Sequence, residues 1–188
     1  MIARLNRSAG TAAAVAAAGW LVMMAGILVH AADSVFSWET VYSLLSAGGL
    51  IVGLVTLVAL NGMLARVGSA RDMWRTLALV LAVLGVGVLA LVTWLIPVWV
   101  GLLSAASLIA AFRLRAATLG SQVGLWAFAA AWPLAMGLIV VLSAMKFRVD
   151  EYGDYPWAEG IGVAVWCGLF ALGLASHAKL LRSESRSS

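Results

Sequence analysis

The chain has 188 residues, of which 64% are hydrophobic and 11% are charged, and its mean hydropathy is +1.04. Soluble domains contain about 45–50% apolar and about 25% charged residues, so this composition excludes a water-soluble domain and predicts an integral membrane protein. The net charge of +4 does not indicate nucleic-acid binding, because the charges fall in short segments between apolar runs and form no single basic face.

Six apolar runs are long enough for spanning helices, which need about 20 mostly apolar residues to cross a hydrocarbon core of about 30 Å. In chain order we predict spans at residues 8–30, 40–65, 76–94, 97–112, 122–145 and 160–178. The stretch 76–112 has 37 residues without a charge, too many for one upright helix. Trp94, Pro97 and Trp99 mark the turn that divides it, because proline lacks an N–H and tryptophan prefers the membrane interface.

The first run has an alternative interpretation as a cleavable signal peptide. Arg4 and Arg7 precede it, and Val29-His30-Ala31 resembles a small-residue cleavage site. Its apolar length of about 20 residues exceeds the 7 to 15 that are usual for a signal peptide. We therefore expect this segment to remain as the first span.

The loop charges test the number of spans, because Lys and Arg are enriched in cytoplasmic loops. With six spans and a cytoplasmic N-terminus, ten of the twelve cations lie inside: Arg4, Arg7, Arg66, Arg71, Arg75, Arg113, Arg115, Lys179, Arg182 and Arg186. Lys146 and Arg148 lie outside, together with six of the eight acids. One long helix over 76–112 would place Arg113 and Arg115 outside. We therefore predict six spans in the inner membrane, with both termini cytoplasmic.

The spans pair into three antiparallel hairpins, at residues 7–66, 75–113 and 122–179, each beginning and ending on the cytoplasmic side. The predicted fold is an all-α membrane protein, a bundle of six transmembrane helices in one domain over residues 1–182. Residues 183–188 are all polar, and we predict a disordered cytoplasmic tail there.

The chain combines three hairpins in a short length with a tryptophan near the start of each hairpin, at Trp20, Trp74 and Trp126. It also has a glycine-rich return helix at residues 48–53. The pattern resembles the HdeD-like family of small six-span bacterial membrane proteins. That resemblance implies six spans and a role in stress or acid resistance, without known catalysis. It implies no particular site residue.

No Asp, Glu, Lys or Arg lies in the middle of a predicted span. Intramembrane charges mark proton relays, ion paths and catalytic centres, so we expect neither an enzyme nor a proton-coupled transporter. Cys167 is the only cysteine, and His30 and His177 lie at opposite ends of the predicted bundle, which argues against a zinc site or a shared haem. We expect no cofactor and no metal, and we place both histidines at the membrane interfaces.

Two span residues are candidates for lining a path or for contact between helices. Asn61 lies about one turn from the cytoplasmic end of its span, and its usual use would be an interhelical hydrogen bond. Pro133 should kink the fifth span by freeing the carbonyl of Ala129. Such a kink either creates a central cavity or shapes the packing.

Both faces of the membrane offer contact candidates. The last outer loop, residues 146–159, is a solvated loop with membrane anchors or a docking surface, with candidates Asp150, Glu151, Asp154 and Trp157. On the inner face, five arginines are expected to contact anionic lipid headgroups: Arg66, Arg71, Arg75, Arg113 and Arg115.

Small residues recur at a spacing of four in three spans and indicate close helix packing. They are Gly10, Ala14 and Ala18 in the first span, Gly49 and Gly53 in the second, and Gly101 and Ala105 in the fourth. They either close the bundle on itself or form a homo-oligomer contact. Taken together, the sequence favours a structural or accessory membrane protein, with a small channel or carrier for a neutral or apolar solute as the alternative.

Overall fold

The computed structural model describes residues 2–32, 43–67, 72–92, 95–117, 120–145 and 156–187. Its elements are α1 (Ile2–Ala32), η1 (Leu44–Gly48), α3 (Gly49–Leu64), α4 (Met73–Leu91), α5 (Ile96–Ala116), α6 (Gln122–Ala144) and α7 (Pro156–Ser187). The short π-helical segment η1 runs directly into α3, and the two form one span. Six helices are long and apolar enough to cross a membrane. The predicted all-α bundle of six helices is therefore confirmed.

Several helix ends differ from the prediction. Asp72 begins α4 earlier than expected, because its Oδ1 accepts a hydrogen bond from the backbone N–H of Trp74 at 3.0 Å. At the other end of this hairpin, α5 continues to Ala116, with Arg113 and Arg115 in its last turn, where cations interact favourably with the helix dipole.

The largest difference concerns α7, which extends beyond residues 160–178 at both ends. In the part of the predicted tail that the structure describes, residues 183–187, the chain is helical as the end of α7. Neither glycine nor proline occurs between residues 174 and 187, so nothing in the sequence terminates the helix.

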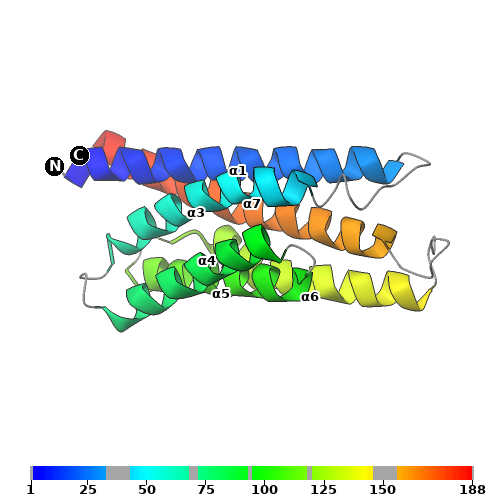
Figure 1. The fold of residues 1–188 in the computed structure, drawn as a ribbon. Helices are drawn as coiled ribbons and strands as arrows, with labels where there is room; N and C mark the ends of the chain where they lie inside the picture. The colour runs from blue at the N-terminus through cyan, green and yellow to red at the C-terminus, as the bar shows by residue number, and fades with distance from the viewer. Residues whose placement is uncertain are drawn as a thin grey trace.

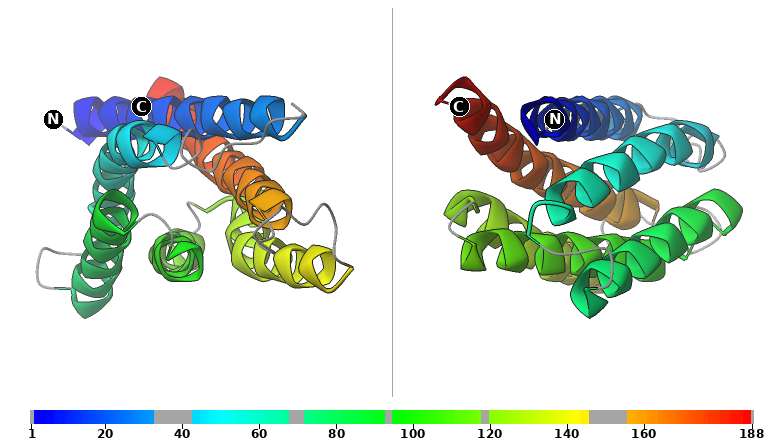
Figure 2. Two further views of the ribbon diagram at one scale, coloured as in Figure 1. Left: turned by 45° about the vertical axis from the view of Figure 1, so that its right-hand side comes forward. Right: turned by 90° about the vertical axis from the view of Figure 1, so that its left-hand side faces the viewer.

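The six spans form a closed ring in chain order. Each helix packs against the next one along the chain, and α1 packs along α7 to close the ring. Figure 1 shows both termini at the same end of the molecule, which we call the termini end. Figure 2 shows the first and last helices side by side, with α4, α5 and α6 on the opposite side of the bundle. The hairpins predicted from sequence are therefore joined into one body by the α1–α7 contact.

Every interface in this ring brings a glycine against a neighbouring helix. A Cβ atom at these positions would fall within 3.3 Å of the neighbour: Gly10 on α7, Gly19 and Gly62 between α1 and α3, Gly53 on α4, Gly85 on α5, Gly101 on α6, and Gly162 and Gly173 between α6 and α7. Helices in lipid associate through close approach of this kind. Gly49 also packs on α4, since a Cβ there would lie 3.0 Å from Leu89 Cδ2, so the predicted close packing at Gly49, Gly53 and Gly101 is confirmed.

Gly62 gives the most rigid of these contacts. A Cβ at Gly62 would lie 2.6 Å from Ala9 Cβ and 3.2 Å from Ala9 Cα, and a backbone atom cannot turn away as a long side chain can. By contrast, a Cβ at Gly87 would meet nothing within 4 Å.

We therefore expect Gly62→Ala to lower the free energy of unfolding by about 1–3 kcal/mol, the usual cost of overpacking. Gly87→Ala makes the same chemical change in open space and should leave stability unchanged or raise it slightly, because alanine favours helix more than glycine does. Reversible unfolding in mixed detergent micelles measures both variants. Equal stabilities would contradict the close α1–α3 contact.

Candidate functional site

The middle of the bundle is occupied by five large aromatic side chains. Trp20 of α1, Trp99 of α5, Phe128 of α6, and Trp166 and Phe170 of α7 are all fully buried. The Trp166 ring lies edge-to-face against Trp99 and Trp20, with centroids 5.2 and 4.9 Å apart, and stacks on Phe170 at 4.6 Å. Phe170 in turn contacts Phe128 at 5.2 Å. We call these five rings the aromatic centre, and they link four of the six helices.

Two hydrogen bonds tie the aromatic centre to polar groups inside the bundle. Trp20 Nε1 donates to Thr56 Oγ1 at 3.0 Å, and that hydroxyl donates to the carbonyl of Val52 at 2.8 Å. Trp166 Nε1 donates to Ser104 Oγ at 2.8 Å. Thr56 belongs to α3, so side chains from five helices contact one another here. Both indole N–H groups are satisfied by the protein, as buried donors require.

Trp99 was expected at the interfacial turn between α4 and α5, and that prediction is wrong. The side chain lies in the aromatic centre instead. Pro97, which was expected at the same turn, does lie in the first turn of α5, where a missing N–H is harmless. Trp94 falls outside the described residues.

Asn61 and Pro133, the two candidates for lining a path, do not come together. Asn61 is exposed near the end of α3, and its Oδ1 accepts a hydrogen bond from Arg75 Nη2 of α4 at 2.8 Å. Pro133 is exposed on α6, which continues as one helix through it. Asn61 therefore makes the interhelical contact that was one of its two predicted uses.

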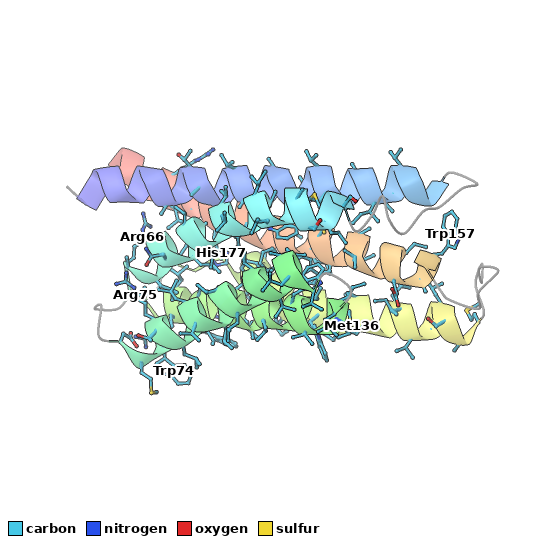
Figure 3. All side chains as sticks on the ribbon, viewed as in Figure 1. Arg66, Trp74, Arg75, Met136, Trp157 and His177 are labelled. Atoms are coloured by element: carbon cyan, nitrogen blue, oxygen red, sulfur yellow. The ribbon has the colours of Figure 1, made fainter. Side chains whose placement is uncertain are left out.

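The predicted headgroup arginines occupy different surroundings. Arg115 is exposed, whereas Arg66 and Arg75 are partly buried at the termini end (Figure 3). Arg113 forms a salt bridge with Asp72, and this carboxylate also caps α4. Arg71 lies outside the described residues. Sequence reasoning missed the Asp72 contacts, although an aspartate directly before an apolar helix is a capping signal.

The structure places one of the four outer-loop candidates. Trp157 lies in the first turn of α7 and is only 9% exposed, so it does not lie on a free loop surface. It is at the end of the bundle opposite the termini (Figure 3). The helix begins at Pro156, a residue suited to a first turn, and this beginning draws Trp157 into the packed end. Asp150, Glu151 and Asp154 lie outside the described residues.

His177 was expected at the membrane interface, but it is buried and 1% exposed. Its Nδ1 lies 2.8 Å from the carbonyl of Gly173, and its ring stacks on Phe128 with centroids 5.7 Å apart. A Cβ at Gly124 would lie 2.3 Å from His177 Cε1, so this glycine makes room for the ring. The Nε2 atom is buried without a hydrogen-bond partner. The side chain of His30 is outside the described part of the structure.

Two grooves lie between neighbouring helices. The larger, about 540 Å³, runs between α1 and α7 and is lined by Ala14, Ala17, Ala18, Leu21, Ala175, Ala178, Lys179 and Arg182. The smaller, about 230 Å³, lies between α4 and α5 and is lined by Trp74, Ile109, Phe112 and Arg113. Neither groove is lined by Asn61, Pro133 or the aromatic centre. Among the described residues, no group of three His, Cys, Asp or Glu side chains could hold a metal.

Comparison with known protein families, with curated proteins and with solved structures finds no match.

The aromatic centre predicts a steep dependence of stability on Trp166. Trp166→Ala should lower the free energy of unfolding by about 3–5 kcal/mol, because it leaves a cavity beside Trp20, Trp99 and Phe170 and removes the partner of Ser104. Trp166→Phe keeps a ring but removes the hydrogen bond, and it should cost less, about 0.6–1.7 kcal/mol for that bond. Unfolding in mixed micelles measures both changes.

Trp126 provides the matched control, since it is 64% exposed on α6. Trp126→Ala removes the same side chain from a lipid-facing position and should have a much smaller effect. If Trp126→Ala and Trp166→Ala were equally destabilising, burial of Trp166 in the aromatic centre would not contribute to the stability of the fold.

Proposed function

We propose that this protein is a non-enzymatic accessory protein of the membrane, which acts through the surfaces that it presents to lipid and to other membrane proteins. The observation that carries this proposal is the aromatic centre. Its five buried rings, on four helices, occupy the place where a channel or carrier would need a path.

The two polar side chains that are bonded to the aromatic centre support the same conclusion. Solute sites in membrane proteins are built from polar groups that can bind the solute, often where a helix is interrupted. Here Thr56 and Ser104 are already bonded to Trp20 and Trp166. Asn61 is engaged by Arg75 near the termini end, outside the aromatic centre.

For the location we propose the inner membrane, with both termini in the cytoplasm. The support is the charge distribution of the loops together with the position of both termini at one end of the bundle (Figure 1). The exposed Arg115 lies in the last turn of α5 and is suited to contact with anionic headgroups. A stress-related role is the finer proposal, and it rests on the resemblance of the three hairpins to the HdeD-like family.

The proposal predicts that the protein does not conduct neutral solutes. Vesicles with and without the reconstituted protein should shrink and reswell at the same rate in glycerol or urea gradients, measured by stopped-flow light scattering. Asn61→Leu serves as the comparison. A faster exchange with the wild type that Asn61→Leu abolishes would replace this proposal with a carrier that uses Asn61. Faster exchange in both proteins would also overturn it.

The proposed orientation predicts opposite labelling of two introduced cysteines. In a Cys167→Ala background, Ala117→Cys should react with a membrane-impermeant maleimide only from the cytoplasmic side. Asp154→Cys should react only from the outer side. Labelling of both cysteines from the same side would refute six spans in this orientation.

A further inference from the structure

The groove between α1 and α7 has an apolar floor of alanines and two cations at one end. Ala17 and Ala178 are buried in its floor, while Ala18 and Ala175 are exposed along its sides. The small-residue series of α1 is therefore only partly used for packing within the bundle. Gly10 packs against α7, but Ala18 faces an open groove.

Lys179 and Arg182 lie on α7 three residues apart, so they share one face of the helix at the groove. Both are exposed, and among the described residues that line the groove none is acidic. Arg182 is the last residue of the α7 span, and Lys179 lies within one turn of it. Side chains at the end of a span reach the lipid phosphates, whereas Ala14, Ala18 and Ala175 lie further along the spans, toward the acyl chains.

Gly10 helps to shape the cationic end of the groove. A Cβ at Gly10 would lie 3.3 Å from both Arg182 Cγ and Leu181 Cβ. Its absence lets the stem of Arg182 lie against α1, so that this arginine spans both walls of the groove. From Arg182 to Ala175 the groove extends seven residues along α7, which corresponds to about 10 Å.

We propose that this groove binds one anionic glycerophospholipid from the leaflet at the termini end. Lys179 and Arg182 hold its phosphate, and one acyl chain lies along Ala14, Ala18 and Ala175. The charge of the groove favours an anionic headgroup over a zwitterionic one, and arginine can form two parallel hydrogen bonds to phosphate. A lipid in this position contacts the first and the last helix together, at the interface that closes the ring.

This inference rests on the proposed location of the bundle in a membrane, but not on the absence of solute transport. The test therefore measures lipid retention and not flux. The full-length protein is reconstituted in vesicles of equal parts phosphatidylcholine and phosphatidylglycerol, extracted in mild detergent, and analysed by native mass spectrometry. One phosphatidylglycerol should remain bound per chain, and no phosphatidylcholine. Retention of both lipids alike, or of neither, would overturn the proposal.

Two pairs of charge variants test the headgroup contact. The double variant Lys179→Gln with Arg182→Gln should weaken the affinity for phosphatidylglycerol, titrated in detergent, by roughly 30-fold. This factor corresponds to about 1 kcal/mol for each of the two cations lost. Lys179→Arg with Arg182→Lys keeps both charges and should keep the bound lipid. Loss in both pairs, or in neither, would contradict binding by these two charges.

A volume variant separates a defined site from general attraction between charges. Ala18→Leu keeps both cations but fills the groove, so it should release the lipid. Ala144→Leu makes the same change at an exposed position of α6 outside the groove and should retain it. Unchanged retention in Ala18→Leu would show diffuse attraction and overturn the site. A wild-type dimer that loses its partner in Ala18→Leu would assign the groove to a second copy of the chain and also overturn it.

Discussion

This bundle depends on the close approach of its helices at glycine residues. Lipid tails are as apolar as leucine side chains, so burial from water cannot hold spanning helices together. Dispersion contacts do so only when the backbones come near each other. Gly62 against Ala9 and Gly85 against Leu103 are two such contacts, and each interface in the ring has one. The order of the helices in space follows from where these glycines lie.

Small residues at the interfaces also create the space that the large rings fill. Gly173 faces Phe128, and a Cβ there would lie 2.5 Å from that ring. Trp166 contacts aromatic side chains from α1 and α5 as well as Phe170 of its own helix. Glycines let neighbouring helices approach closely, and the large rings fill the space between the helices at the aromatic centre. The hydrogen bonds to Thr56 and Ser104 fix the orientation of two indole rings, which favours one packing over a set of alternatives.

The sequence predicts the spans well because hydropathy and loop charge are local properties. It also predicts the contact of Asn61, because an amide near lipid needs a partner. It fails for Trp99 and His177, since tryptophan and histidine suit both a membrane interface and a buried site with a hydrogen bond. Which of these applies depends on neighbours such as Trp166 and Gly124, which are distant in the chain. The α1–α7 groove is unpredictable for the same reason, because it joins the two ends of the sequence.

The contact between α1 and α7 closes the ring by joining the two ends of the chain. Five of the six interfaces join helices that follow each other in the chain, so short connections keep them close. The α1–α7 interface has no such connection, and loop-closure entropy opposes it most. It is also where the small-residue face of α1 is only partly covered and where Lys179 and Arg182 share one end of the groove. The proposed anionic lipid would cover that face and bring its phosphate to these two cations. A lipid bound there would therefore add a link between the two helices that no short connection joins.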